Sequence, residues 1–145
     1  MIKYIKGDAT YPIKDNAIIA HVVNDIGKWG SGFVLAISKK WYTPEEQYRR
    51  TIKYILGDIQ NIQVESNIVV VNLIAQHGIY NKNNKLPIKY DALRNCLKKL
   101  NEYAIKMKMS IHMPKIGSGL ARGNWEIIEK IINEEIKTEC YVYLK

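Results

Sequence analysis

The sequence is poor in the residues that indicate a metal site or a disulfide framework. Its 145 residues include only two cysteines and three histidines. Cys96 and Cys140 form no C-x-x-C pair, and no cluster of His and Cys stands at the spacing of a zinc site. Such cysteines are typical of small buried residues in a reducing compartment. We therefore expect no metal, no cofactor and a cytoplasmic protein.

Long apolar runs and internal repeats are absent as well. No run approaches the roughly 18 apolar residues of a membrane span, and the opening MIKYIKGD lacks the apolar core of a signal peptide. A chain of this length buries about two-thirds of the surface that it exposes when unfolded. We expect one domain over residues 1–145, acting as a monomer with no membrane partner.

Acidic residues are outnumbered, which gives a formal net charge of +8. Such a charge can indicate a nucleic-acid binder, but the Arg side chains that read bases bidentately are few. Of the 22 basic residues only Arg49, Arg50, Arg94 and Arg122 are Arg, and the lysines are scattered along the chain. The charge favours a small anionic ligand over nucleic acid, which stays open as a further alternative.

A glycine-rich stretch follows the apolar run of residues 17–23, which is typical of a parallel strand covered on both faces. We call residues 24–32 the first glycine loop, because Gly27, Gly30 and Gly32 lie in it, directly before a predicted helix over residues 33–40. Free N–H groups and the positive end of the helix dipole would face a guest in this loop. An anion such as a diphosphate is the natural ligand.

A second stretch of this kind, residues 115–120 (KIGSGL), follows the short apolar segment 111–113. We call it the second glycine loop; a further helix is predicted to begin near Trp125. The Rossmann pattern G-x-G-x-x-G and the phosphate-loop pattern G-x-x-x-x-G-K-[ST] are both absent. One such loop is also compatible with a plain tight connection, whereas two of them favour a ligand site.

The rest of the chain alternates strand and helix patterns. Strands are predicted at residues 1–6, 56–64, 68–75, 110–113 and 140–144, and further helices from Thr43, Tyr90 and Asn124. Thr43 and Glu46 would form a capping box, and Asn124 would cap the last helix. Residues 65–67 would be a hairpin turn. The alternation implies an α/β fold, a mixed sheet sandwiched between helices.

Polar residues follow the strand ends, where the loops of such a sheet converge on one crevice. Asn24 and Asp25 follow one strand, and Gln76 and His77 follow another. His77 is the better acid–base candidate because it falls in a loop, where a pKa near neutrality is usable. Residues 76–86 are either a substrate loop or a plain surface excursion.

The other two histidines lie in apolar strands. His21 is inside the run of residues 17–23, and His112 is inside the short strand of residues 110–113. We interpret His21 as a hydrogen-bonded core histidine rather than a catalyst, and His112 as structural.

These motifs together resemble the macrodomain family, whose members bind ADP-ribose. The matching segments are GDAT (7–10), AHVVND (20–25) leading to WGSG (29–32), and PKIGSGL (114–120) with NW (124–125) behind it. They run in the family's order through nearly the whole chain. Within the family the sequence is most similar to the branch of the terminal ADP-ribose protein glycohydrolase and the yeast-type ADP-ribose 1''-phosphate phosphatase.

The resemblance implies a macrodomain-like three-layer α/β/α sandwich with a mixed central sheet. It implies ADP-ribose or ADP-ribose 1''-phosphate as ligand, and an ADP-ribosylated protein as a further partner. Asp8 would accept from the adenine amino group, and Tyr143 would lie near the adenine. The candidate catalytic residues are Asn24 and Asp25, which match positions that face the distal ribose, and His77. The candidate ligand-binding residues are Asp8, Ala9, His21, Asn24, Gly30, Ser31, Gly32, Phe33, Gln76, Ile116, Gly117, Ser118, Gly119, Leu120 and Tyr143.

Two positions depart from the glycohydrolase pattern. Gln76 stands where that enzyme has its nucleophilic lysine, and Ala121 stands where it has its catalytic aspartate. We therefore expect no lysyl intermediate. The leading hypothesis is a macrodomain that hydrolyses an ADP-ribose derivative, foremost the 1''-phosphate. The alternative is a non-catalytic binder of ADP-ribose or a related signalling nucleotide.

Overall fold

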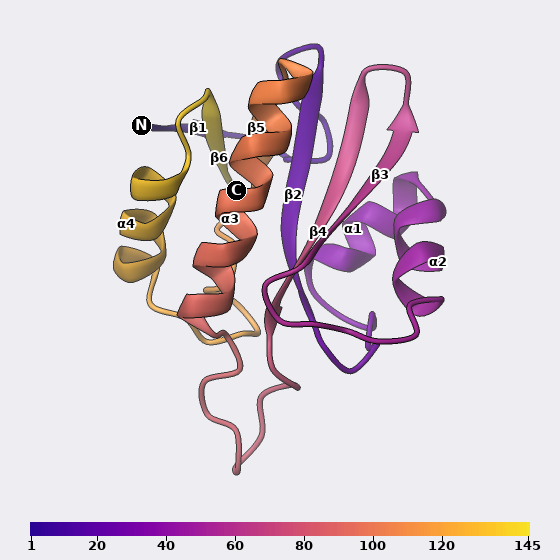
Figure 1. Ribbon diagram of the computed structural model, residues 1–145, viewed down its shortest axis with the longest axis vertical. Helices are drawn as coiled ribbons and strands as arrows, with labels where there is room; N and C mark the ends of the chain where they lie inside the picture. The colour runs from indigo at the N-terminus through magenta and orange to yellow at the C-terminus, as the bar shows by residue number, and fades with distance from the viewer.

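Six strands form one mixed sheet in the computed structural model, which describes residues 1–145 (Figure 1). The strands are β1 (Ile2–Lys6), β2 (Ala17–Asn24), β3 (Ile59–Glu65), β4 (Ile68–Gln76), β5 (Ser110–Met113) and β6 (Cys140–Leu144). Their order across the sheet is β1-β6-β5-β2-β4-β3. Only β3 is antiparallel to its neighbour. Because all the other pairs are parallel, the carboxyl ends of β1, β2, β4, β5 and β6 share one edge of the sheet.

Four helices cover the two faces, which confirms the predicted three-layer sandwich. Helices α1 (Phe33–Lys40) and α2 (Thr43–Arg49) lie on one face, and α3 (Tyr90–Met107) and α4 (Trp125–Glu135) lie on the other (Figure 1). Successive side chains of a strand point to opposite faces. In β2, Ile18 and Ala20 accordingly join the core under α3 and α4, while Ile19 and Val23 join the core under α1 and α2.

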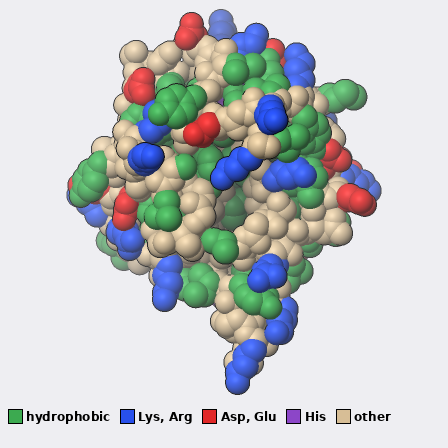
Figure 2. All heavy atoms as spheres, turned by 180° about the vertical axis from the view of Figure 1, so that it is seen from behind, with side chains coloured by type: hydrophobic (Ala, Val, Ile, Leu, Met, Phe, Trp, Pro, Cys, Tyr) green, Lys and Arg blue, Asp and Glu red, His purple; other side chains and the backbone are tan.

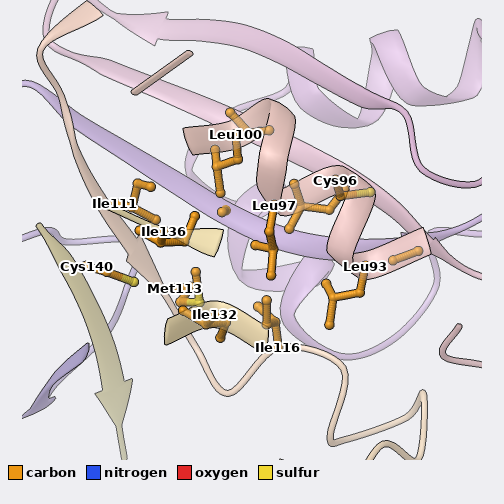
Figure 3. Close-up of a cluster of buried hydrophobic side chains, with 14 of the residues drawn as sticks. Leu93, Cys96, Leu97, Leu100, Ile111, Met113, Ile116, Ile132, Ile136 and Cys140 are labelled. Carbon is orange, nitrogen blue, oxygen red and sulfur yellow. The ribbon is translucent and has the colours of Figure 1, made fainter. Parts of the chain in front are cut away.

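The larger core fixes the second glycine loop. Leu93, Leu97 and Leu100 recur at helical spacing on α3, and Figure 3 shows them on the side that faces Ile132 of α4. Each such fully buried side chain contributes about 2 kcal/mol from its apolar surface. Ile116 of the loop is 3% exposed and belongs to the same cluster. The loop is therefore anchored in the core at the side chain of Ile116.

Two predicted element boundaries were wrong. The predicted strand from residue 56 begins only at Ile59, because Gly57 has a φ of 99° and its N–H donates to the carbonyl of Ile74, so the chain turns there. The capping box does not form: α2 begins at Thr43 itself, and no side chain caps it. Tyr42 has helical angles and occupies the cap position, so the Thr43 hydroxyl comes one residue too late. The predicted Asn124 cap is confirmed, since its Oδ1 accepts from the N–H groups of Glu126 and Ile127.

Both cysteines are buried and free, as predicted. No helix has the length and apolar character needed to cross a membrane. No group of three or more His, Cys, Asp and Glu side chains is placed to hold a metal ion.

Candidate functional site

A cavity of about 530 Å³ lies where the loops after β2, β4 and β5 meet. β2 pairs with both β4 and β5, so these three loops are neighbours at one edge of the sheet. Figure 2 shows the back face hollowed near its middle, with Lys and Arg side chains around the hollow. The wall of the cavity consists of His21, Val22, Val23, Asn24, Lys28, Gly30, Ser31, Gly32, Phe33, Val34, Gln76, Ile79, Tyr80, Pro114, Lys115, Ile116, Gly117, Gly119, Leu120, Ala121 and Arg122.

The first glycine loop is shaped by the side chain of Asn24. Its Oδ1 accepts from the N–H groups of Ile26 and Lys28, both at 3.1 Å, and its Nδ2 donates to the carbonyl of Lys28 at 2.8 Å. The hydroxyl of Tyr48 lies 2.6 Å from the same Oδ1. Asn24 thus lies on the cavity wall with its amide already engaged in holding the loop.

The end of the first glycine loop presents backbone donors. Gly32 has a φ of 84°, which is accessible to glycine and strained for other residues, and α1 begins at the next position. The N–H groups of residues 30–33 donate no hydrogen bond within the protein. A Cβ added to Gly30 would meet no atom within 4 Å. This stretch therefore offers free N–H groups beside open space on the cavity wall.

The glycines of the second glycine loop differ in how much space surrounds them. A Cβ on Gly117 would lie 3.1 Å from Ile88 and from Ile128, whereas a Cβ on Gly119 would meet nothing within 4 Å. Just after the loop, a Cβ on Gly123 would come within 2.5 Å of the Gly117 carbonyl. The N–H groups of residues 117–120 donate no hydrogen bond within the protein. The loop is packed from behind and open, with free donors, toward the cavity.

The cavity wall is electrostatically one-sided. It includes Lys28, Lys115 and Arg122 but no Asp or Glu. The Arg122 guanidinium lies 4.0 Å from the centre of the Tyr80 ring, and neither Arg122 nor Lys28 forms an ion pair. A cleft lined by charge of one sign concentrates ligands of the opposite sign. The ligand that suits this wall is an anion.

Asp25 and His77 meet at the base of the loop after β4, outside the cavity wall. Asp25 Oδ2 lies 2.8 Å from His77 Nδ1, and Asp25 Oδ1 accepts from the N–H of Gly78 at 2.8 Å. Ile79 and Tyr80, further along this loop, reach the cavity wall. The pair therefore anchors the segment that closes one end of the cavity, and its catalytic role stays a prediction.

Gln76, the last residue of β4, lies on the cavity wall. Its Nε2 donates to the carbonyl of Gly78 at 3.0 Å, within the same loop. The position matched to a nucleophilic lysine is thus at the site, and it holds an amide.

His21 is both a core residue and part of the cavity wall. It is 1% exposed, and its Nε2 lies 2.6 Å from Asn72 Oδ1, which confirms the predicted hydrogen-bonded core histidine. Burial lowers its pKa from 6.5 to about 4, so the ring is neutral at pH 7. Its Nδ1 is buried and has no hydrogen-bond partner.

The residues predicted to surround the adenine lie next to the cavity rather than on its wall. Asp8 is exposed, and one of its carboxylate oxygens accepts from the N–H and the hydroxyl of Thr10. Ala9 and Tyr143 form a small buried cluster that packs against Phe33, which is on the wall. The roles of Asp8, Ala9 and Tyr143 stay predictions.

Ser118 is also not on the cavity wall, and its hydroxyl donates to the carbonyl of Lys115. His112 is buried, with its two ring nitrogens at the hydroxyls of Ser110 and Tyr143, which is a structural position as predicted. Several wall residues, among them Lys28, Tyr80 and Arg122, were not predicted as site residues from the sequence. The one available signal was a pair of apolar residues, Ile79 and Tyr80, in an otherwise polar loop.

Comparisons with known proteins agree on the family, although no family model matches the chain. A protein of unknown function from Bacteroides thetaiotaomicron is 49% identical, with a TM-score of 0.94 over 99% of this chain and 97% of that one. A macrodomain protein from Streptomyces coelicolor is 37% identical, with a TM-score of 0.86 over 100% of this chain and 99% of that one. A Thermosipho africanus protein solved in complex with ADP-ribose, 14% identical over 88% of this chain and 38% of that one, shares the fold with a TM-score of 0.72.

Curated relatives differ in length. The mouse chromodomain-helicase-DNA-binding protein 1-like is 31% identical over 98% of this chain, which spans only 17% of that relative. The ADP-ribose 1''-phosphate phosphatase of Candida albicans is 26% identical over 99% of both chains. With 37% identity to the Streptomyces coelicolor macrodomain protein, over nearly the whole of both chains, this chain belongs to the macrodomain family.

Proposed function

We propose that the protein binds ADP-ribose in the cavity, with the diphosphate held between the two glycine loops. The observation that carries this proposal is the pair of donor rows, the free N–H groups of residues 30–33 and of residues 117–120. The two rows are neighbours, because a Cβ added to Gly32 would lie 3.0 Å from the Leu120 side chain, and this supports their binding of one small anion. Three basic residues and no carboxylate on the wall support the same choice of ligand.

We propose an orientation of ADP-ribose along the cavity from the order of the strands. Asp8 and the cluster behind Phe33 belong to the end of the cavity near β1 and β6, whereas Gln76 and Tyr80 belong to the end near β4. We place the adenine at the first end and the distal ribose at the second. The complex of the Thermosipho africanus protein with ADP-ribose, which shares this fold, supports the choice of nucleotide.

The sharpest test is a side chain placed inside the cavity. Gly119→Val adds a branched side chain where a Cβ meets no protein atom, so the fold is expected to tolerate it while the ligand is excluded. Calorimetry should detect ADP-ribose binding to the parent and none to Gly119→Val at an unchanged melting temperature. Gly32→Val is a poorer probe, because the φ of 84° and Leu120 at 3.0 Å strain the variant itself.

Ser66→Val, in the hairpin turn between β3 and β4, is the matched control and should bind as the parent does. Equal affinity of Gly119→Val and the parent would remove the diphosphate from this loop. Absence of binding to the parent would remove ADP-ribose altogether.

A second candidate function is hydrolysis of ADP-ribose 1''-phosphate. The observation that favours it is a pair of cations without carboxylate partners, Arg122 over Tyr80 and Lys28, on the wall beside the predicted distal-ribose end. The likeness to the Candida albicans phosphatase over 99% of both chains supports the same substrate. In this hypothesis a water attacks the phosphorus and the bond from phosphorus to the ribose oxygen breaks. Asn24 positions the distal ribose, Asp25 or His77 takes a proton from the water or returns one to the leaving oxygen, and N–H groups of the second glycine loop stabilise the phosphoryl oxygens.

Phosphate release from the 1''-phosphate tests this candidate. Arg122→Gln should weaken binding of the 1''-phosphate about tenfold and weaken ADP-ribose binding much less, since only the former carries the second anion. His77→Ala should lower kcat much more than it weakens binding. A related activity, release of ADP-ribose from modified glutamate or aspartate side chains, is assayed in parallel. If ADP-ribose binds tightly and neither phosphate nor ADP-ribose is released, the protein is a binder and the enzymatic hypothesis fails.

A further inference from the structure

A series of side-chain hydrogen bonds runs across the face of the sheet that α1 and α2 cover, from the edge beside α2 to the cavity. Thr51 Oγ1 donates to the backbone carbonyl of Gln47 at 3.0 Å, and Gln60 Nε2 donates to Thr51 Oγ1 at 2.7 Å. Asn72 Nδ2 then donates to Gln60 Oε1 at 3.1 Å, and Asn72 Oδ1 faces His21 Nε2 at 2.6 Å. Four side chains thereby connect a surface groove between α2 and β3 with the wall of the cavity.

Which group donates and which accepts in this series of hydrogen bonds is fixed by its first member, Thr51. A backbone carbonyl only accepts, so the single proton of the Thr51 hydroxyl is used on Gln47, and the hydroxyl must accept from Gln60. The amide NH₂ of Gln60 is thus at Thr51, and its oxygen faces Asn72. A second carbonyl, that of Pro44, lies 3.4 Å from Asn72 Nδ2 and requires the same orientation of the Asn72 amide.

The orientation of Asn72 determines the protonation of His21. Asn72 Oδ1 is an acceptor, so His21 Nε2 must carry the proton. The ring is neutral because burial lowers its pKa to about 4, and a neutral imidazole has one N–H. Nδ1 is therefore an acceptor, and it is the buried side-chain polar atom left without a partner. Buried polar atoms of this kind ordinarily have one.

We propose that Thr51, Gln60 and Asn72 are positioning residues that hold His21 in its Nε2–H form, so that Nδ1 accepts a hydrogen bond from an uncharged hydroxyl of the ligand. His21 belongs to the cavity wall. Of the rings packed on it, Phe33 has no donor and Trp29 already donates its indole N–H to Ser38, so neither satisfies Nδ1. The two riboses of ADP-ribose supply hydroxyls, and in this respect the inference rests on the proposed function. An anionic group carries no proton for Nδ1, so this position separates sugar from phosphate within the cavity.

The form of the ring is tested without any ligand. In protein labelled with ¹⁵N in its three histidines, the His21 signals are assigned by their loss in His21→Gln. The expected spectrum at pH 7 shows a protonated Nε2 and an unprotonated Nδ1, with no exchange between forms. A protonated Nδ1, or an averaged pair of signals, would overturn the inference whether or not ADP-ribose binds.

Saturation with ADP-ribose tests the contact. The His21 Nδ1 resonance should move toward the hydrogen-bonded range, while that of Nε2 stays in place. An Nδ1 resonance that does not move at saturation would mean that a bound water, or nothing, meets this atom, and the ligand contact would be overturned. If calorimetry shows no ADP-ribose binding, the proposed function and the ligand contact fail together. The ligand-free spectrum alone then shows whether Thr51, Gln60 and Asn72 hold His21 in its Nε2–H form.

Remote variants separate positioning from packing. Gln60 is not on the cavity wall, so Gln60→Leu should affect ligand binding only through Asn72 and His21. We expect an averaged His21 spectrum and an ADP-ribose affinity about fivefold lower, on the scale of one neutral hydrogen bond. Gln60→Glu keeps an acceptor toward Asn72 and should restore both readouts.

Gln63→Leu is the matched control on the same strand. The Gln63 side chain bonds only to the carbonyls of Glu65 and Ser66 and to none of Thr51, Gln60, Asn72 and His21. Neither the His21 spectrum nor the ADP-ribose affinity should therefore change. Equal effects of Gln60→Leu and Gln63→Leu would show that β3 acts on the cavity through packing, and the positioning role would be lost.

Discussion

Asp8 keeps one carboxylate oxygen available although it is already engaged in its own turn. Its Oδ1 accepts from the N–H and the hydroxyl of Thr10, at 2.9 Å and 2.8 Å, and these bonds hold the carboxylate in place. The other oxygen has no hydrogen-bond partner within the protein and is exposed. A fixed carboxylate of this kind is suited to accept from an exocyclic amine, the predicted role at the adenine.

Replacing Asp8 should therefore weaken ADP-ribose binding. We expect Asp8→Ala to cost about 1.5–3 kcal/mol of binding free energy, the scale of a hydrogen bond to a charged group. Calorimetry with ADP-ribose and with its hypoxanthine analogue, which lacks the amine, checks the role. The parent should prefer the adenine ligand and the variant should not. Asp15→Ala, which replaces another exposed aspartate, is the control. If Asp8→Ala binds ADP-ribose with the affinity of the parent, the adenine lies elsewhere.

Single residues were predicted best where their role is local. The Asn124 cap depends on N–H groups two and three positions ahead, and the sequence displays both partners. The pairs of Asp25 with His77 and of Arg122 with Tyr80 join residues far apart in sequence through a loop that folds back on the sheet. No local pattern encodes such contacts. Asp25 and His77 were therefore predicted as site residues without their pairing, and the place of Tyr80 and Arg122 on the wall was not predicted.

Among the elements, α4 most directly supports the second glycine loop. Asn124 caps it, and Ile128 packs against the loop where a Cβ on Gly117 would lie. The position of the free N–H groups therefore depends on how α4 begins.

Removing this cap should destabilise the protein and loosen the loop. Asn124→Ala is expected to lower the free energy of unfolding by about 1 kcal/mol, the usual value of such a cap. Urea unfolding measures it, with Asn83→Ala at the exposed tip of the loop after β4 as control. The control should change the free energy by less than about 0.5 kcal/mol. An unchanged stability of Asn124→Ala would show that packing alone sets the start of α4.

Elements with a strong apolar period were predicted well, and their ends less well. The spacing of Leu93, Leu97 and Leu100 identified α3, because burial on one face imposes the helical period. The start of β3 and the cap of α2 depended instead on backbone angles at Gly57 and Tyr42. Those angles follow from tertiary packing, which a pattern of apolar residues does not contain.

The whole molecule contains two buried neutral histidines, on strands that share one sheet. Burial lowers the pKa of both His21 and His112 from 6.5 to about 4. Between these two values the unfolded chain binds protons that the folded protein excludes. Both histidines thus favour the unfolded state as the solution is acidified, and neither has an effect above pH 6.5.

Stability should accordingly decrease as the pH falls from about 6.5 to about 4, and this contribution should level off below that. Each histidine is expected to lower the free energy of unfolding by about 2 kcal/mol at pH 5, because pH 5 lies about 1.5 pH units below the ordinary pKa of 6.5 and each pH unit in this window contributes about 1.36 kcal/mol. Urea unfolding at pH 7, 6 and 5 measures the slope, and His112→Gln should reduce it by about half. A variant with the slope of the parent would show that carboxylates alone cause the loss.

The sheet order was the part of the architecture least accessible from patterns alone. The position of β6 between β1 and β5 joins strands separated by most of the chain, and it follows from long-range pairing. The resemblance to macrodomains supplied the mixed central sheet between two layers of helices, and the order of its strands was not predicted.

The floor of the cavity and its walls should differ greatly in how fast their amides exchange with deuterium. β2 pairs with β4 along its length and with β5 over residues 17–19, and all its residues except Val22 are buried, so the amides that donate to these neighbours open only with the whole fold. The N–H groups of residues 30–33 and 117–120 have no internal acceptor and exchange freely in the empty protein. A bound diphosphate would slow those eight positions and leave the floor untouched, so exchange in the presence of a candidate ligand maps its contacts residue by residue.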